Sequence, residues 1–261
     1  MAPSSLLLQN GPVIERVVDG LFAFCGLLGS TSEGAHTIDR DGVRAAVVPV
    51  APERAVANSV VYRNADALEG VYDELATAYG EIGANWTVWV WPSDEAAGSF
   101  LEGRGHALDA QPAGMIHDLK GLERPAPTAL PDWTDNGDFT VVGPLNDRAY
   151  GFDTDSFTRA MSIRPGESTH IYVAYDHDEA AGCVLVTDHD GNADVESVAV
   201  LPEARGRGIS GKLMRHALVD AAERGNETST LVATALGYPV YERLGYRTLG
   251  RFAMWERAAR S

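Results

Sequence analysis

The chain has 261 residues, and its 21 basic against 37 acidic residues give a formal net charge of −16. This acidic surplus argues against broad nucleic-acid binding and against an anionic membrane surface, because both partners require a basic face. With 45% hydrophobic and 22% charged residues, the composition is that of a folded, soluble protein. No apolar run approaches the ~18 residues that span a bilayer.

The two cysteines and residues 1–11 bear on the cellular compartment in which the protein acts. Cys25 and Cys183 lie far apart without metal-type spacing, so we expect neither a disulfide framework nor a metal site. Residues 1–11 contain three consecutive leucines but lack the basic start and long apolar core of a signal peptide. We therefore expect a cytoplasmic protein.

One stretch of the chain has the composition of a linker. Residues 120–138, KGLERPAPTALPDWTDNGD, combine three prolines with Ala, Thr, Asp and Gly. Proline removes backbone donors and disfavours helix in the residue before it, so this stretch is expected to be exposed. We predict a first domain over residues 1–122, a linker over residues 123–137 and a second domain over residues 138–261.

The second half shows a clear order of elements, because hairpin signals and helical periodicity alternate along it. In chain order, the predicted elements are a strand at 139–142, helix within 145–161, strands at 171–175, 183–187 and 195–200, a helix around 213–222, a strand at 230–234, a short helix at 238–244 and a strand at 251–255. This order predicts a mixed α/β fold, that is, α+β with a mixed sheet.

The first half repeats this order weakly, with an offset of about 140 residues. The strand predicted at 86–91 stands where 230–234 stands, and residues 115–119 stand where 252–256 stand. We interpret this pattern as a diverged duplication, although any two α/β segments can look alike at this level of detail.

The most informative segment is VAVLPEARGRGISGKL, residues 198–213, which runs from a strand through a glycine-containing loop into a helix. Glycines let consecutive backbone N–H groups converge on an anion, and a helix N-terminus adds about half a positive charge. The segment therefore predicts a phosphate-binding loop. A glycine turn without a ligand does not explain two arginines among the glycines just before a helix.

Two familiar phosphate-binding motifs match the glycine pattern of this segment, but the residues and elements around it do not fit either motif. Gly206, Gly208 and Gly211 spell the dinucleotide fingerprint, yet in that motif the strand runs directly into the first glycine. The P-loop requires Ser or Thr after its lysine, whereas Leu213 follows Lys212. The chain after Gly211 is also too short for the remaining units of either fold.

A third interpretation fits the context. Residues 205–210, RGRGIS, resemble motif A of the GNAT superfamily of acyl-CoA N-acyltransferases, whose pattern is Arg/Gln-x-x-Gly-x-Gly/Ala; Ser210 departs from its last position but is small. Residues 238–246, YPVYERLGY, resemble the second signature, Tyr-Glu-x-Leu-Gly-Phe/Tyr. The resemblance covers roughly residues 138–257 and implies a GNAT fold there. The first half resembles a degenerate copy, whose residues 62–65 lack a glycine nest and should not bind pyrophosphate.

The resemblance implies a metal-free acyltransferase that moves an acetyl group from acetyl-CoA to a primary amine of a small molecule or peptide. The pyrophosphate would lie on the loop, the pantetheine arm would pair with the splayed strand, and a backbone N–H near Val200 would polarise the thioester carbonyl. The residues expected to bind acetyl-CoA are Val198, Ala199, Val200, Arg205, Gly206, Arg207, Gly208, Ile209, Ser210 and Gly211.

Three residues are the catalytic candidates. The amine must lose a proton before it attacks, and a carboxylate acting through water can take it. Glu196 is the first choice of base and Asp194 the second, because both share a strand face with the residues nearest the thioester. Tyr241 stands where the family carries the acid that protonates the leaving thiolate, and Tyr238 is a weaker candidate. A solvated or arginine-paired carboxylate and a core tyrosine remain the plain alternatives.

Other functions also stay open. A non-catalytic acyl-CoA-binding regulatory module would keep the glycine loop without a working base and acid. The acidic turns at 176–178 and 188–190 contain histidine, but they are expected to be solvated loops and not metal sites. His216 is expected on the surface of its helix.

The role of the first half is also open. It could cover the acceptor cleft or form the face of a homodimer. Trp86, Trp89 and Trp91, which we place on one strand face, would belong to the core or to such an interface.

Overall fold

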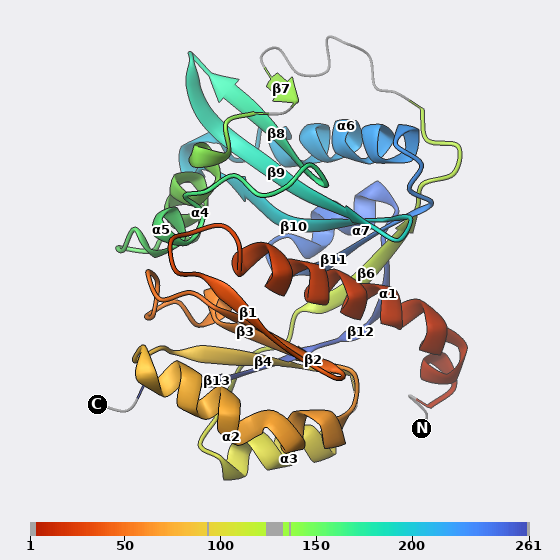
Figure 1. Ribbon diagram of the computed structural model, residues 1–261. Coiled ribbons are helices and arrows are strands. Elements are labelled where there is room, and N and C mark those ends of the chain that lie inside the picture. The colour runs from red at the N-terminus through yellow and green to blue at the C-terminus, as the bar shows by residue number, and fades with distance from the viewer. Residues whose placement is uncertain (1–3, 93, 124–132, 136, 260–261) are drawn as a thin grey trace.

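Runs of β-branched and aromatic residues pair into two mixed β-sheets, with amphipathic helices on their faces (Figure 1). The computed structural model describes residues 4–92, 94–123, 133–135 and 137–259. The first sheet has the order β1 (His36–Arg40), β2 (Val43–Val47), β3 (Ser59–Tyr62), β4 (Trp86–Val90), β13 (Ala253–Arg257) and β5 (Ala107–Ala110). The second sheet has the order β12 (Arg247–Arg251), β6 (Ala113–Asp118), β11 (Thr228–Ala233), β10 (Asn192–Val200), β9 (Glu179–His189), β8 (Thr169–Asp176) and β7 (Trp133–Asp135).

Seven α-helices accompany these strands in the described part of the chain: α1 (Ser4–Leu28), α2 (Ala65–Glu81), α3 (Glu95–Gly103), α4 (Val142–Tyr150), α5 (Ser156–Ala160), α6 (Ile209–Glu223) and α7 (Tyr238–Leu244). Short 3-10 helices are η1 (Ala55–Ala57), η3 (Phe139–Val141) and η4 (Pro202–Ala204). The predicted mixed α/β class is confirmed.

The same order of elements occurs twice along the chain. The series β1-β2-β3-α2-β4-α3-β5-β6 is followed by the series β8-β9-β10-α6-β11-α7-β12-β13. Each series contains one parallel pair, β3 with β4 and β10 with β11. The weak sequence repeat therefore corresponds to a repeat of topology.

The two halves exchange a strand. The last strand of the first series, β6, lies in the second sheet between β11 and β12, and the last strand of the second series, β13, lies in the first sheet between β4 and β5. In Figure 1 the blue β13 accordingly lies beside the orange and yellow strands. The predicted domain boundary at 123–137 stays a prediction, because most of that segment lies outside the described residues.

Helix α1, which the sequence analysis did not predict, lies between the two sheets (Figure 1). Its buried residues recur at helical spacing: Ile14, Val17, Val18, Leu21, Cys25 and Leu28. They join one main core with residues of both sheets, such as Val61 and Leu231. Burying each large apolar side chain stabilises the fold by roughly 1.5–3 kcal/mol, so α1 holds the halves together.

Helices α2 and α3 cover the outer face of the first sheet and form a separate outer core with it. Helix α2 begins after Asn64, whose side chain accepts the N–H of Ala67 at 2.9 Å. Such a cap satisfies one of the free donors at a helix start. From there the buried residues again follow the helical repeat: Leu68, Tyr72, Leu75 and Tyr79.

Two sequence expectations about the core and its elements are wrong. Residues 139–142 form η3 and the start of α4, not a strand, because Asp138 accepts the N–H of Thr140 at 2.9 Å and starts a helical turn.

Trp86 and Trp89 lie on opposite faces of β4, since strand side chains alternate. Trp86 stacks on Tyr79 in the outer core, with ring centroids 4.8 Å apart, whereas Trp89 belongs to the main core.

The strand exchange makes a prediction about folding. We expect residues 1–122, expressed alone, to show no cooperative thermal transition in circular dichroism, because their sheet lacks β13 and their own β6 lacks partners. Residues 138–261 alone should fail likewise. As a control, a chain cut within 124–132 with both parts co-expressed should melt close to the intact chain. A cooperative transition of the isolated first half would contradict the expectation.

Candidate active site

Strands β10 and β11 diverge at the centre of the second sheet. Their parallel pairing starts at Asn192 and ends at Val195, opposite Leu231. Beyond that point β10 stays paired with β9 as far as Val200, and the register against β9 shifts at Glu196. A bulge of this kind bends a strand and redirects its side chains. The result is an open backbone edge from Glu196 to Val200, so the splay that the family resemblance implied is present.

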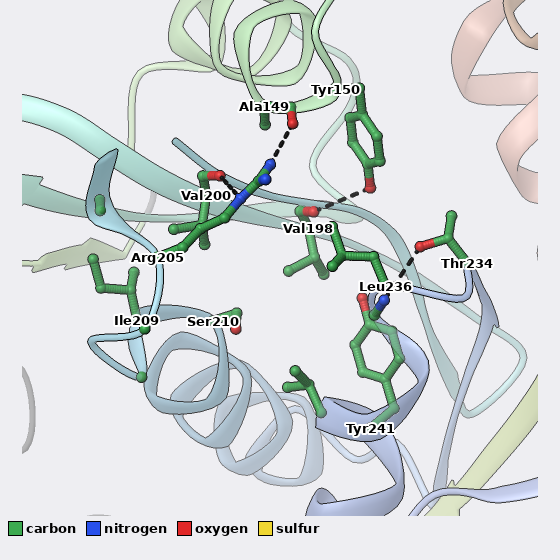
Figure 2. A pocket seen from close by; sticks show the side chains of 15 residues that line it. Ala149, Tyr150, Val198, Val200, Arg205, Ile209, Ser210, Thr234, Leu236 and Tyr241 are labelled. Carbon is green, nitrogen blue, oxygen red and sulfur yellow. Dashed lines mark hydrogen bonds between the residues drawn. The ribbon is translucent and has the colours of Figure 1, made fainter. Parts of the chain in front are cut away.

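Backbone groups on this edge point into the opening. The carbonyl of Val198 accepts a hydrogen bond from Tyr150 Oη at 3.4 Å, and the carbonyl of Val200 accepts one from Arg205 Nε at 3.2 Å (Figure 2). The N–H and C=O of one strand residue point to the same side. The N–H groups of Val198 and Val200 therefore also face the opening, where an extended ligand could pair with them.

The loop after η4 presents a row of free backbone donors. Gly206 and Gly208 have φ of +77° and +75°, a left-handed conformation that favours glycine. Within the described residues, no acceptor lies in hydrogen-bonding geometry with the N–H groups from Gly206 to Gly211, and Lys212 is the first to bond back, to Gly208 O at 3.1 Å. Free N–H groups at a helix start form a site for an anion such as phosphate.

The arginine side chains of this loop hold it in place. Arg205 donates to the carbonyls of Val200 and Ala149, which ties the loop to β10 and to the end of α4 (Figure 2). Arg207 pairs with Asp176 at the end of β8, with Nη2 to Oδ1 at 3.0 Å, and lowers the pKa of that carboxyl. The backbone, and not these guanidinium groups, thus supplies the donors of the anion site.

A cavity of about 230 Å³ lies between this loop and α7, and we call it the loop cavity (Figure 2). Its walls come from α4, β10, the loop, and the segment from β11 into α7. The lining residues include Val198, Val200 and Ser210 on one side and Leu236 and Tyr241 on the other. The cavity connects the anion site to the open strand edge.

A second cavity of about 240 Å³, the acid cavity, adjoins the loop cavity. The two share the lining residues Tyr150, Val198, Thr234 and Tyr241. Asp194 and Glu196 line the acid cavity, and the first half of the chain contributes further lining residues, among them Leu21, Phe24, Arg54, Val56 and Trp89. A ligand that extends along β10 would therefore end next to a chamber built by both halves.

Asp194 is a buried acid held by α1 and β11. Its side chain accepts a hydrogen bond from Thr230 Oγ1 at 2.6 Å, and the residue is 6% exposed. It packs against Gly20 so closely that a Cβ on that residue would lie 2.3 Å from Asp194 Oδ1. Burial raises the pKa of Asp194 to about 7, although the Thr230 hydroxyl acts against the shift.

Glu196, at the bulge, lies beside Asp194 and is more strongly perturbed. Both carboxylate oxygens are buried, and within the described residues neither has a partner in good hydrogen-bonding geometry. Burial, and then the charge of Asp194, raise the pKa of Glu196 well above its ordinary value, against a smaller effect of Thr187. Two carboxyl groups this close do not ionise independently, so the pair retains a proton near neutral pH.

Tyr241, on α7, lies where the two cavities meet. The residue is 8% exposed, and its ring packs against Gly237, where a Cβ would lie 2.8 Å from Tyr241 Cε2. Burial, and then the nearby Tyr150, raise the pKa of Tyr241, which keeps its hydroxyl protonated at neutral pH. Tyr238, the weaker candidate, lines neither cavity, and its hydroxyl bonds to that of Thr248 at 3.0 Å.

Several residues that line the acid cavity could not be identified from sequence motifs, chiefly Arg54, Asn146, Tyr150 and Thr234. They belong to no motif, and Arg54 comes from the other half of the chain. The only available signal was the suggestion that the first half covers an acceptor cleft, and the structure does place it against the acid cavity.

The structure also places His216 and the two acidic turns at 176–178 and 188–190. His216 is 3% exposed and lies on the buried side of α6, so the expectation of a surface position is wrong. Asp176 and Asp188, in the acidic turns, pair with Arg207 and Arg224 respectively. Among the described residues, no group of three or more His, Cys, Asp or Glu could hold a metal ion.

In the first half, the position equivalent to the loop and splay is filled by the chain itself. Asn64 caps α2, as described above, and the N–H of Arg63 bonds to Gly42 O at 2.7 Å. Past the paired part of β3, Trp91 Nε1 donates to the carbonyl of Tyr62 at 2.8 Å, and Tyr62 Oη donates to Asp94 at 2.7 Å. These bonds satisfy backbone and side-chain groups at the end of β3 and the start of α2 within the first half itself.

Comparisons with known proteins agree with this architecture. Residues 167–248 match the family described as acetyltransferase (GNAT) domain. The GCN5-related N-acetyltransferase from Kribbella flavida is 14% identical, with 92% of this chain and 94% of that chain covered and a TM-score of 0.62. The GCN5-related N-acetyltransferase from Sphaerobacter thermophilus is 19% identical, with 88% and 84% covered and a TM-score of 0.59.

A tandem GNAT protein from the clavulanic acid biosynthesis pathway is 17% identical, with 95% of this chain and 96% of that chain covered and a TM-score of 0.55. No curated protein matched the sequence. The two-sheet fold with its splayed parallel pair is therefore that of the GNAT proteins. Within this fold, residues 167–248 are the part of the chain that matches the GNAT acetyltransferase domain.

Proposed function

We propose that this protein transfers an acetyl group from acetyl-CoA to a primary amine of a small molecule or peptide. The main support is the row of free N–H groups from Gly206 to Gly211, which continues into the open edge of β10. The diphosphate of acetyl-CoA would lie on the loop, and the pantetheine arm would follow Val198 and Val200 to the acid cavity. Ala199, Arg205, Arg207, Ile209 and Ser210 complete the proposed binding segment.

In the proposed reaction the amine attacks the thioester carbonyl from the acid cavity. A C–N bond forms, the C–S bond breaks, and the amine proton passes to Glu196, directly or through water. A backbone N–H near Val200 polarises the carbonyl oxygen. Tyr241 donates its hydroxyl proton to the departing thiolate, and the proton held by Glu196 later returns to Tyr241 through solvent.

The buried position of the acids suits this role. A general base works best with a pKa near the operating pH. Burial moves the pKa of Asp194 to about 7 and raises that of Glu196 further, and the two acids titrate as a pair. We assign the chemistry to Glu196 because it lies at the bulge, next to the open edge, and assign Asp194 to its control.

We also propose that no metal takes part and that the protein acts in the cytoplasm. The two free thiols, Cys25 and Cys183, are buried and suit a reducing compartment. Within the described residues, no helix combines the length and apolar character needed to cross a membrane.

The test of this function is thiol release from acetyl-CoA across a panel of primary amines, followed together with calorimetric binding of CoA. We expect CoA to bind and at least one amine to release thiol well above the amine-free rate. CoA binding without turnover on any amine would favour a non-catalytic acyl-CoA-binding module instead. Absence of CoA binding would overturn the proposal altogether.

Tyr241→Phe is expected to lower kcat about 10–100-fold, because the thiolate would leave without a proton donor. Tyr238→Phe is the matched control, since it removes a hydroxyl that lines neither cavity. It should keep kcat within about two-fold of the wild type. Equal turnover by Tyr241→Phe and the wild type would remove Tyr241 from the mechanism. The measurement is steady-state thiol release at saturating acetyl-CoA.

A further inference from the structure

The acid cavity contains charges of both signs. Besides Asp194 and Glu196, its described lining includes the guanidinium of Arg54 and no other Arg or Lys side chain. The rest of the lining is mainly apolar and aromatic, with Trp89, Phe152 and others around the charged groups. A buried ionised group in such surroundings needs a partner of opposite charge, because burial removes its contacts with water.

Arg54 lacks such a partner. It precedes η1 in the first half and extends toward α4 and α5, where its Cζ lies 3.2 Å from the ring centroid of Phe152. Its Nη2 makes a long bond of 3.4 Å to Asn146 Oδ1, whereas Nε and Nη1 are buried with no acceptor among the described residues. Burial lowers the pKa of Arg54, although the charges of nearby acids act against this shift.

The acids whose charges act most on Arg54 are Asp147, Glu256 and Glu53; none lies within ion-pair distance of it among the described residues, and two of them are engaged elsewhere. Asp147 accepts bonds from the N–H of Phe157 at 3.1 Å and from the N–H and hydroxyl of Thr158 at 2.9 and 2.8 Å, which position the start of α5. Glu53 pairs with Arg159. Within the described residues no carboxylate lies within ion-pair distance of Arg54, so two of its donors have nothing to bind.

Glu196, in the same cavity, lacks a partner as well. Its two oxygens are buried without a well-placed donor, and Asp194 next to it adds a like charge instead of an opposite one. Arg54 and Glu196 do not form an ion pair with each other in the described structure. One cavity thus contains an unpaired guanidinium and an unpaired acid at separate places.

We propose that the acceptor carries a carboxylate as well as its primary amine, so that Arg54 binds the carboxylate while the amine lies at Glu196. This inference rests on the proposed function, because it names the substrate class of that reaction. A guanidinium fork matches a planar carboxylate with two parallel hydrogen bonds. Phe152 covers one face of the guanidinium, so we expect the side chain to turn its donor edge into the cavity when the carboxylate enters.

The size and lining of the cavity narrow the class further. A volume of about 240 Å³ suits a single small molecule, and the aromatic and aliphatic walls favour an apolar body between the two charged ends. The acceptor is therefore a free amino carboxylate, such as an amino acid, and not the lysine side chain of a folded protein.

The first experiment needs no variant. Binding to the full-length protein is measured by calorimetry, with CoA present, for amino acids and for the matched primary amides of their carboxylates; turnover of both series is measured by thiol release. Charged hydrogen bonds of about 1.5–3 kcal/mol correspond to roughly 10–150-fold in affinity. We expect the amino acid to bind at least ten-fold more tightly than its amide. Equal binding of the two would overturn the proposal.

The second experiment uses Arg54→Gln, with Arg40→Gln on the exposed part of β1 as the control. The dissociation constant of the amino acid should rise 10–100-fold in Arg54→Gln, whereas those of the amide and of CoA should stay unchanged. Arg40→Gln should alter none of them. An equal loss for acid and amide would refute a role for Arg54 in carboxylate binding.

The outcomes separate this inference from the proposed function. If amides are acetylated as well as amino acids, the acetyltransferase assignment holds and the inference fails. If amino acids bind in an Arg54-dependent way but no thiol is released, the inference holds for the cavity and the catalytic assignment fails.

Discussion

Glu196→Gln is expected to lower kcat for amine acetylation by about 10²–10³-fold, because the amide cannot accept the amine proton. Affinity for CoA, measured by calorimetry, should stay within about two-fold, since the loop and the edge of β10 are untouched. Asp194→Asn is the matched control, because it removes the neighbouring acid but leaves Glu196 in place. It should retain at least a tenth of the wild-type kcat. Equal losses in both variants would contradict a special role for Glu196.

The pH profile adds an independent measurement. The wild-type log kcat/KM should rise with pH through an apparent pKa at or above about 7, because the acid pair must lose its shared proton before Glu196 can act. Asp194→Asn removes the charge that helps to raise the pKa of Glu196. The rising limb should therefore move to lower pH in this variant. A limb that does not move would show that the two groups are not coupled in catalysis.

Stability provides the control for folding. Both acids have raised pKa values in the folded state, so the native state binds more protons than the unfolded state between about pH 4 and pH 7. Their stabilising contribution is complete below pH 4 and is lost as pH rises through 7. Above that pH, Glu196→Gln should melt no lower than the wild type. A lower Tm would attribute its lost activity to misfolding.

Gly208→Asp is expected to raise the dissociation constant of CoA at least 100-fold. Asp and Asn tolerate the left-handed φ of this position better than other side chains, and both cap helices well, so α6 should remain folded. The new carboxylate would occupy the free N–H groups and repel the diphosphate.

Gly208→Asn tests the charge alone. The neutral side chain has nearly the same shape, so we expect a loss of only about ten-fold, from competition for the same N–H groups. Calorimetry with CoA measures both variants. Equal losses in the two variants would show that shape and not anion binding decides the effect, and wild-type affinity in both would place the diphosphate elsewhere.

The part of the site that could be predicted from the sequence is local. The loop at Gly206 and Gly208, the helix after it and the strand before it are continuous in the chain, so turn chemistry and periodicity predict them. The positions of Glu196 and Tyr241 near one cleft followed from the family resemblance. The bulge at Glu196 could not be predicted, because it depends on the register between β9 and β10.

The parts that were missed depend on distant segments. Arg54 lines the acid cavity only because the fold brings the two halves together around it, and nothing in the sequence near Arg54 indicates this. The strand exchange likewise depends on which of the two sheets β6 and β13 join, and the residues of these strands do not encode that choice locally. The helical turn at Phe139 was mistaken for a strand because four consecutive residues carry no periodicity that separates the two.

Interlocking of β6 and β13 has a consequence for selectivity. If the two halves moved apart as rigid bodies, the hydrogen-bond ladders between β6 and β11 and between β13 and β4 would have to break. These ladders hold the backbone around Arg54 at a set position relative to the strand that carries Glu196. If Arg54 binds the acceptor carboxylate as proposed, we expect the enzyme to select acceptors by the distance between their amine and their carboxylate.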